Sequence, residues 1–572
     1  MRPAQTNALP PQPAEGLERH LLPALRQRFK AEVNRLTSGG MRELLGASPE
    51  ADELSFLLSY LYAFEWLRRE VHPRYRAAVV APFRKASRTF LMDLLVQAED
   101  ATGFVRAYLD HMIGAADEEL RERQQVLRLL ERRDHDPAQL IERILSTWHA
   151  LGLFGRPNAE AYRALARHER ERYAGMLGAE DRERLALVDA LPDRSVSALP
   201  FAKLGVIPAM GCPQTCRHCM FIWRPPMRNV PDPGELYRLV GAHTDSVLFT
   251  GGDLTRHLHH FVRAIREMRP VRTFAILLNG GFADDWTTTD AVLGDMAAAI
   301  RERPRSWPAA RILLQISFDE FHQEIVADRD GLLRERIPVG KIANIVESAP
   351  RHREVQLCLV HKQTALNFSM DLFRKGVFGR LVEELGRRGH QVRVLAASPS
   401  RRLKQHPLDP TQTGQVVKDA SFILSRYPDR PILLSSSTID AYGRAALLDP
   451  GEAVNERALL HRLLEGDDLN GDPFDTDLMF WFNGWATLFS AVHVCLGNLY
   501  DDGADRVLAR HRKDPLTAAL RVFDRRLLDY YGEVRDDLER HVGRATSPHH
   551  LFHVLTEAPA MRLHMTRRLV GA

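Results

Sequence analysis

The middle of the chain alternates short apolar runs with stretches of helical periodicity, and this alternation limits the possible folds more than any other feature. Near-continuous apolar strands joined by helices are typical of parallel βα units, whose sheet is covered on both faces. Because eight such units close a full barrel, six predict a partial (β/α)6 TIM-like barrel, which is an α/β fold. The six predicted strands are residues 204–210, 246–252, 272–281, 310–319, 354–361 and 390–398.

The two ends of the chain differ from this middle part. Near the N-terminus, Leu21, Leu25 and Phe29 recur at helical spacing, and similar apolar stripes continue to about residue 195. A chain of 572 residues also exceeds the roughly 250–300 residues that one core usually serves. We therefore predict three regions, which are an all-helical N-terminal domain (1–195), the partial barrel (196–404) and a small mixed α+β C-terminal extension (405–572).

Composition and charge exclude several classes of protein. Hydrophobic residues make up 45% of the chain, charged residues 27%, and the net charge is +4. Basic and acidic residues are interleaved, so a nucleic-acid partner is not expected. No run approaches the ~18 apolar residues of a membrane span, and the N-terminus lacks the apolar segment of a secretory signal. We therefore expect a cytoplasmic protein without a membrane partner, whose clustered cysteines indicate a metal or catalysis rather than disulfides.

Three of the five cysteines lie within eight positions, directly after the first predicted strand. Their spacing is Cys212-x3-Cys216-x2-Cys219, on a loop at the edge of the sheet where ligands usually bind. Thiolates select soft metals such as zinc, copper(I) and iron–sulfur clusters. A structural zinc site needs four ligands, and His218 is awkwardly placed as the fourth. A [4Fe–4S] cluster held by three thiolates instead leaves one iron open to a substrate or cofactor.

This cysteine loop resembles the signature of the radical S-adenosylmethionine (radical SAM) superfamily. The second predicted strand ends in TGGD, and its Gly251, Gly252 and Asp253 resemble the Gly-Gly-Glu motif that meets the amino group of S-adenosylmethionine. Glycine permits such a close backbone approach. The fourth strand ends in SFD, which places Ser317 and Asp319 where the family often keeps ribose-binding groups. The sixth strand resembles the edge whose backbone meets the adenine.

The resemblance covers about residues 201–400 and implies one [4Fe–4S] cluster bound by the three cysteines of the loop. Its open iron would bind S-adenosylmethionine, and a flavodoxin- or ferredoxin-like donor would supply the electron that releases a 5′-deoxyadenosyl radical. The chain departs from the family pattern at three points. Asp253 replaces the usual glutamate, His218 stands where an aromatic ring is common, and the fifth strand lacks a glycine-rich stretch.

Asp319 and His322 are the candidate catalytic residues, because both follow the fourth strand at the ligand-binding edge. They suit ribose contact or proton transfer. An equally weighted interpretation is that Asp319 caps a helix and His322 faces solvent. Two further pairs are better explained by ordinary packing and by solvated surface, namely Trp223 with Arg224 and Arg401 with Arg402.

The remaining cysteines are expected to be buried thiols. Cys358 lies inside the fifth predicted strand, where a core position is expected. Cys495 follows a predicted hairpin (477–492) with Asn483-Gly484 at a type I′ turn. This segment resembles the C-terminal extension of radical SAM enzymes that modify peptides, in which additional cysteines bind auxiliary clusters. One cysteine is too few for such a cluster, so we predict a trimmed extension without one; hydrogen-atom donation by Cys495 is the alternative role.

Three functions are compatible with these features. The first is a radical SAM enzyme that abstracts hydrogen from a peptide or natural-product substrate, with the N-terminal helices available to dock a substrate or partner. The second is a radical SAM mutase, dehydrogenase or epimerase that acts on a small metabolite. The third is a non-catalytic protein with a structural zinc-binding cysteine loop. Sulfur insertion and cobalamin-dependent methylation are disfavoured, because the cysteines of a second cluster and an N-terminal βα domain are missing.

Overall fold

The computed structural model describes most of the chain from the first helix to the C-terminus. The described residues are 17–34, 49–84, 89–100, 103–104, 107–108, 159–192, 201–214, 216–221, 232–323, 325–327, 333–364, 377–400, 404–406, 409–448, 453–467, 469 and 474–571. Trp223, Arg224, Arg401 and Arg402 lie outside them.

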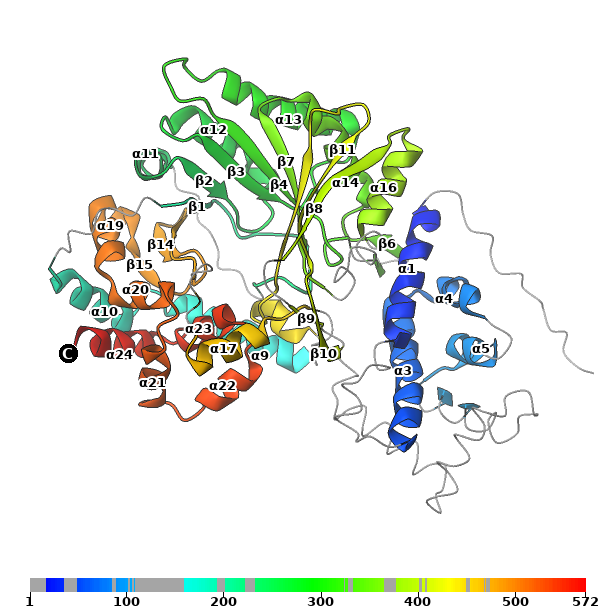
Figure 1. Ribbon diagram of the computed structural model, residues 1–572. Coiled ribbons are helices and arrows are strands. Elements are labelled where there is room, and N and C mark those ends of the chain that lie inside the picture. Colours follow the sequence, from blue (N-terminus) through cyan, green and yellow to red (C-terminus); the bar gives the residue numbers. More distant parts are fainter. Residues whose placement is uncertain are drawn as a thin grey trace, which may run out of the picture.

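An eleven-stranded sheet forms the centre of the protein, in the order β15-β14-β13-β1-β2-β3-β4-β7-β12-β11-β8 (Figure 1). Seven adjacent strands, from β13 to β12, are parallel, and the strands beyond them pair antiparallel. The strands are β1 (Leu204–Ile207), β2 (Ser246–Phe249), β3 (Thr273–Leu278), β4 (Arg311–Ser317), β7 (Val355–Lys362), β8 (Val392–Pro399), β11 (Val417–Leu424), β12 (Ile432–Ser437), β13 (Leu478–Trp481), β14 (Trp485–Leu488) and β15 (Cys495–Asn498).

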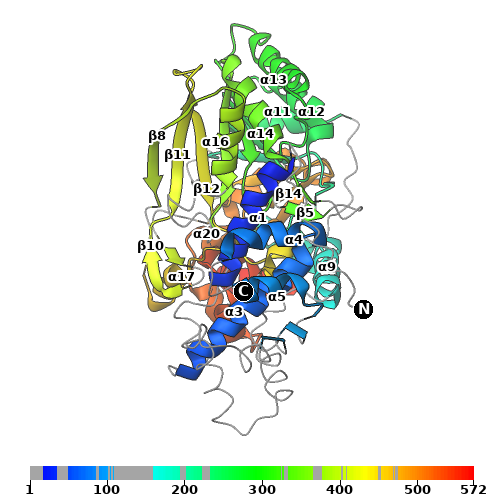
Figure 2. The same ribbon diagram turned by 90° about the vertical axis from the view of Figure 1, so that its right-hand side faces the viewer.

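The α/β class is confirmed, whereas the partial (β/α)6 TIM-like barrel is not, because the sheet does not close and ends at β15 and β8. Five of the six strands predicted in the middle of the chain are neighbours in the order β1-β2-β3-β4-β7. The sixth, β8, lies at the edge and pairs antiparallel with β11 (Figure 2). β12 takes the place beside β7 and pairs parallel with it. The long β11–β12 antiparallel pair therefore displaces β8, and most of the β8 side chains are exposed.

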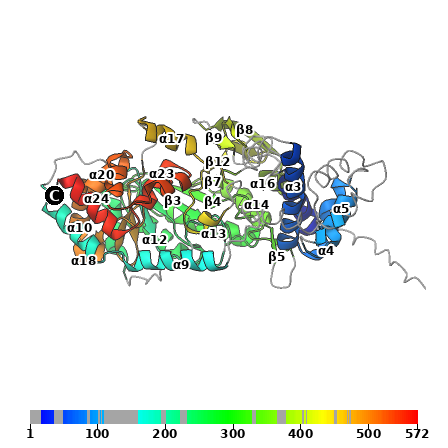
Figure 3. The same ribbon diagram turned by 90° about the horizontal axis from the view of Figure 1, so that it is seen from below.

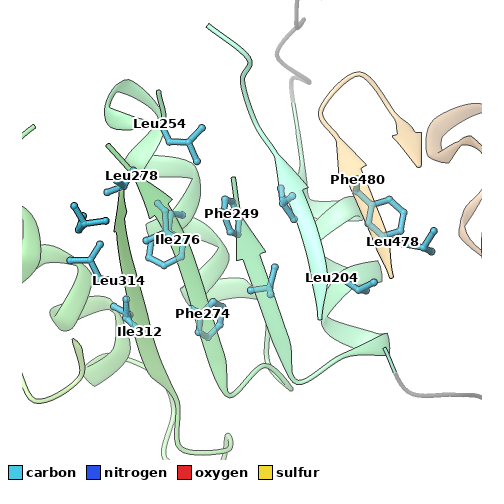
Figure 4. Close-up of a cluster of buried hydrophobic side chains, with 14 of the residues drawn as sticks. Leu204, Phe249, Leu254, Phe274, Ile276, Leu278, Ile312, Leu314, Leu478 and Phe480 are labelled. Carbon is cyan, nitrogen blue, oxygen red and sulfur yellow. The ribbon is translucent and has the colours of Figure 1, made fainter. Parts of the chain in front are cut away.

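Helices that follow the parallel strands cover one face of the sheet. Successive helices pack on one another along this face, and the facing side chains of the strands form one continuous core. Because side chains alternate along a strand, Phe274, Ile276 and Leu278 of β3 all lie in this core (Figure 4). The helices are α11 (Gly234–His243), α12 (Leu258–Glu267), α13 (Trp286–Arg301), α14 (Val339–Ser348) and α16 (Val377–Arg387).

Every described element before β1 is a helix. Four of these helices share a separate core, in which Phe29, Phe64, Leu67 and Leu95 are almost fully buried. They pack next to α16 and a small hairpin of β5 (Ile325–Ala327) and β6 (Leu333–Glu335). The four helices are α1 (Leu17–Asn34), α3 (Pro49–Glu70), α4 (Pro73–Val80) and α5 (Thr89–Gln97). No described helix has the length and apolar content needed to cross a membrane.

The region after residue 404 continues the sheet and then forms helices. The predicted hairpin is confirmed as β13 and β14, which extend the sheet beside β1. The predicted type I′ turn is wrong, because such a turn needs a positive φ at both of its central residues. Gly484 has a φ of 91°, whereas the φ of Asn483 is negative. The Gly484 amide instead donates to the Trp481 carbonyl, as in a three-residue loop that ends in a glycine. The small hairpin of β9 (Lys404–His406) and β10 (Asp409–Gly414) lies beside α17 (Arg457–Glu465).

The C-terminal helices lie at the opposite end of the molecule from the four N-terminal helices (Figure 3). They are α18 (Leu499–Asp502), α19 (Ala504–Lys513), α20 (Pro515–Arg521), α21 (Arg526–Gly532), α22 (Leu538–Arg544), α23 (Pro548–Leu555) and α24 (Pro559–Val570). Two helices that precede β1, α9 (Ala159–Ala174) and α10 (Ala179–Ala190), pack against this group instead of joining the N-terminal core.

Two buried ion pairs attach α10 to the C-terminal helices. Arg562 donates two hydrogen bonds to Asp181, at 3.0 and 2.7 Å, and both side chains are buried. Arg184 donates to Asp514 at 3.0 Å, with neither side chain exposed. Removing one partner from such a pair leaves the other charge buried without compensation.

Asp181→Ala is expected to lower the free energy of unfolding by about 3–5 kcal/mol, because the Arg562 guanidinium stays buried without its carboxylate. Urea denaturation followed by circular dichroism measures this loss. Glu183→Ala is the matched control, since Glu183 lies on the same helix and pairs with exposed Arg567 of the same partner helix. Glu183→Ala should lower the free energy of unfolding by less than about 1 kcal/mol. Equal losses in the two variants would contradict the role of the buried pair.

Candidate active site

The loops that follow the parallel strands meet at one edge of the sheet, the carboxyl edge, because these strands all run in the same direction. The cysteine loop (residues 208–221) follows β1, and the TGGD turn (residues 250–253) follows β2. Asn279 follows β3, and Asp319 follows β4. Ligands of open parallel sheets usually bind at this edge.

The three cysteines of the cysteine loop form no disulfide and lie in a partly dry environment. Cys216 is 5% exposed, and Cys212 and Cys219 are half-buried. Burial raises the pKa of the Cys216 thiol to about 12; Arg336 opposes this shift, whereas Asp319 and the other two cysteines add to it. The three sulfurs are therefore close enough to interact. Deprotonation of all three thiols in such a place would require a compensating positive charge.

The TGGD turn is hydrogen-bonded directly to the cysteine loop. The amide of Gly252 donates to the carbonyl of Ala209 at 3.0 Å, and the amide of Asp253 donates to that of Gly211 at 2.7 Å. Gly251 has a φ of 137°, a conformation that favours glycine. A Cβ atom on Gly251 or Gly252 would overlap the backbone of residues 209–211. Both glycines are thus required by the packing of the cysteine loop, a role that the sequence alone did not reveal.

The Asp253 side chain closes the same turn. One carboxylate oxygen accepts hydrogen bonds from the amide of Thr255, at 3.0 Å, and from its hydroxyl, at 2.7 Å. This arrangement begins the short helix η4 (Thr255–His257). Asp253 therefore stabilises the turn itself.

A distant segment holds the other end of the cysteine loop. The short helix η7 (Gly443–Leu447) begins with Gly443, whose φ is 61° and whose backbone lies directly against that of Met220. The amide of Arg444 donates to the carbonyl of Cys219 at 2.9 Å, and its side chain reaches the carbonyl of Gln214 at 3.5 Å. Sequence analysis missed this segment, because it lies more than 220 residues away and contains no motif.

An apolar cluster supports the loop. Tyr173 of α9 contacts Trp481 of β13, with ring centroids 6.0 Å apart, and Met210 and Phe221 of the loop belong to the same cluster. Cys495 is fully buried in it and donates to the carbonyl of Gly497 at 3.3 Å. Burial raises the pKa of the Cys495 thiol to about 12. Cys358 is likewise buried, within β7.

Asp319, His322 and His218 form a compact polar cluster beside the cysteine loop. One oxygen of Asp319 accepts from the amides of Phe321 and His322, at 3.0 and 2.9 Å. The other lies 2.9 Å from Nδ1 of His322 and 4.0 Å from Nε2 of His218. Burial tends to raise the pKa of Asp319, but the two histidines and these hydrogen bonds hold it well below its usual range. Burial lowers the pKa of His218 to about 3, so its imidazole is neutral.

The structure bears on the simpler of the two interpretations of this pair and leaves ribose contact and proton transfer as predictions. Asp319 caps the turn that follows β4, as the simpler interpretation expected. His322 does not face solvent, since only 15% of its side chain is exposed. Ser317, the other residue that the resemblance assigns to ribose, is half-buried at the end of β4 and pairs with Val360 of β7. The strand assigned to the adenine, β8, lies at the far edge of the sheet, and β12 occupies the sixth position.

Two polar residues at the carboxyl edge escaped the sequence analysis. Asn279 is 9% exposed, and its amide nitrogen has no hydrogen-bond partner among the residues that the structure describes. Lys362, the last residue of β7, donates to the hydroxyl of Ser437 at 2.8 Å. Burial lowers the pKa of Lys362, against the opposing effect of Asp319 and Asp440. Asn279 directly follows the apolar strand β3, and Lys362 is the last residue of β7. A polar residue at the end of an apolar run is the same signal that identified Asp319.

Comparisons with known proteins do not assign a function to this site. No protein-family model matches the sequence, and no curated protein matches it either.

Gly252→Ala is expected to displace the cysteine loop, because the new methyl group overlaps the Gly211 carbonyl. Overpacking of this kind lowers the free energy of unfolding by about 1–3 kcal/mol. We expect a lower unfolding temperature and faster labelling of the loop thiols by a thiol reagent. Gly211→Ala is the matched control, since a Cβ atom there meets nothing within 4 Å. If the two variants melt and label alike, the TGGD turn does not hold the loop.

Proposed function

We propose that the chain is a radical SAM enzyme, which binds one [4Fe–4S] cluster through Cys212, Cys216 and Cys219 and abstracts hydrogen from a peptide or natural-product substrate. The observation that carries this proposal is the position of the three cysteines. They lie on one loop at the carboxyl edge, and the TGGD turn holds that loop in place.

The donor set suits the proposed cluster. Three soft sulfur ligands on a partly buried loop favour an iron–sulfur centre, and a three-thiolate set leaves one iron open. When bound, such a cluster together with S-adenosylmethionine supplies a 5′-deoxyadenosyl radical, which removes a hydrogen atom from a substrate. A structural zinc site would require a fourth protein ligand. The ring of His218 instead stacks on Phe321, with centroids 4.8 Å apart, and its Nε2 faces Asp319.

The residues around the loop support binding of a polar cofactor. Gly251 and Gly252 bring the backbone of the TGGD turn against the loop that carries the cysteines. Ser317 and the amide nitrogen of Asn279, which has no partner among the described residues, add hydrogen-bonding groups at the same edge. The apolar cluster around Trp481 limits the access of water from the side of β13. Exclusion of water protects reactive intermediates in general.

The face of the sheet opposite the helix-covered core is only partly covered by the described residues near its centre, which favours a substrate larger than a small metabolite. Gln315 of β4, Val360 of β7 and Ser435 of β12 lie on the face opposite the helix-covered core, and all three are half-buried. This face continues from the carboxyl edge across the open sheet. An extended peptide or natural product has room to bind here, whereas an enzyme for a small metabolite has no need of such a surface.

The proposed electron donor, a flavodoxin- or ferredoxin-like protein, needs access to the neighbourhood of the cluster. Met220, which directly follows Cys219, is 41% exposed. This part of the loop therefore offers a surface at which a donor can approach.

The proposal is tested by anaerobic reconstitution with iron and sulfide, followed by S-adenosylmethionine and dithionite. We expect the wild-type protein to form 5′-deoxyadenosine, measured by mass spectrometry. Cys216→Ala should reduce the product to background, because the cluster loses a ligand. Cys358→Ala, which removes a buried cysteine outside the loop, should retain product formation. Absence of product from a wild-type protein that carries a full cluster would contradict the proposed function.

A further inference from the structure

A second set of potential metal ligands, which contains no cysteine, is formed by one residue of the cysteine loop and two residues that follow β4. The set consists of His218, Asp319 and His322, and one ligand atom from each lies within 4.8 Å of the other two. The residues come from two segments that are about 100 positions apart in the sequence, so the fold brings them together. His218 and Asp319 are buried, and His322 is nearly so.

We propose that His218, Asp319 and His322 bind a divalent transition-metal ion at a site separate from the cysteine ligands. Two imidazoles and one carboxylate are a donor set that suits iron(II), manganese(II) or zinc. Three protein ligands leave further coordination positions for water or for a substrate oxygen. The inference does not depend on the proposed function, because none of the three ligands is a cysteine.

The distances fit a shared ion. Metal–ligand bonds of about 2.1 Å place two ligands of one ion no more than about 4.2 Å apart. The Oδ2 atom of Asp319 lies 2.9 Å from Nδ1 of His322 and 4.0 Å from Nε2 of His218. The 4.0 Å separation is too long for a hydrogen bond but is close to twice a metal–nitrogen bond. Side-chain movements of about half an ångström would complete the coordination.

The surroundings already orient the ligands. The backbone amides of Phe321 and His322 bind one oxygen of Asp319, which directs the other oxygen towards the two histidines. The ring of His218 stacks on Phe321 and meets His322 edge-on, with centroids 4.7 Å apart. Metal ligands are commonly fixed in this way by contacts behind them.

His218 turns one of its two nitrogens towards the carboxylate. Its side chain is more than nine-tenths buried, and Nε2 lies 4.0 Å from Oδ2 of Asp319. A metal ion bound by Nε2 would bridge this separation, which is too long for a hydrogen bond, and would connect the cysteine loop to the end of β4. The other nitrogen, Nδ1, has no hydrogen-bond partner within the described part of the chain and is not one of the proposed ligand atoms.

Cobalt(II) is the probe for this site, because its visible absorption distinguishes nitrogen and oxygen ligands from thiolates. The full-length chain is titrated after removal of iron and zinc, both as wild type and with all three loop cysteines changed to serine. We expect about one cobalt per chain in the serine variant, with d–d absorption and no thiolate charge-transfer band. His322→Ala in the same background should weaken binding at least tenfold.

His352→Ala is the matched control. His352 also pairs with a carboxylate, Asp290, at 3.1 Å, and its side chain has the same 15% exposure, but no second histidine completes that set. Circular dichroism verifies that each variant is folded. If the serine variant is unstable, His322→Ala and His352→Ala are compared in the wild-type chain, where the site is measured as a second cobalt that adds d–d absorption without further thiolate charge transfer. Equal cobalt affinity in His322→Ala and His352→Ala, or no stoichiometric binding at all, would overturn the proposal.

Discussion

The close contact between two loop backbones determines the rest of this structure. At Gly251 and Gly252 the turn after β2 approaches the loop after β1 so closely that a side chain on either glycine would collide with it. The amides of residues 250, 252 and 253 donate hydrogen bonds to carbonyls of residues 206, 209 and 211. The contact therefore begins between the strands β1 and β2 and extends into the cysteine loop. The first part of the cysteine loop is therefore tied to the neighbouring turn by main-chain hydrogen bonds, which suits a centre that must keep its ligands in fixed positions.

The flanking regions support the same loop from the other side. Gly443 and Arg444 hold the backbone near Cys219. The residue before this pair, Tyr442, stacks on His553 of α23, with ring centroids 4.2 Å apart. Asp440 accepts a hydrogen bond from Ser547 at the start of the same helix.

The helix α9 joins this support through a buried carboxylate. Arg172 donates to Glu557 at 3.1 Å, and Glu557 also contacts His168 and His553. Burial tends to raise the pKa of Glu557, but these partners hold it well below its usual range. The helices before and after the sheet thus stabilise the cysteine loop through a chain of polar contacts, which gives both flanking regions a structural role.

Local patterns in the sequence predicted the parallel strands, because each is a nearly continuous apolar run that ends at a polar or glycine-rich turn. The same logic located the cysteine loop, the TGGD turn and Asp319. The order of the edge strands could not be predicted, since the pairing of β8 with β11 is a long-range choice that leaves no local signal. The contact of Gly443 with the backbone of Met220 and the ring contact of His218 with His322 also result from tertiary packing, so no local pattern predicts them.

The central claim is that the cysteine loop binds a [4Fe–4S] cluster with one open iron. Electron paramagnetic resonance of the reduced, reconstituted protein, recorded with and without S-adenosylmethionine, tests this claim most directly. A cluster with an open iron should give a reduced iron–sulfur signal that changes when S-adenosylmethionine is added. A protein that takes up one zinc and no sulfide, or a cluster whose signal is unchanged by S-adenosylmethionine, would contradict the account.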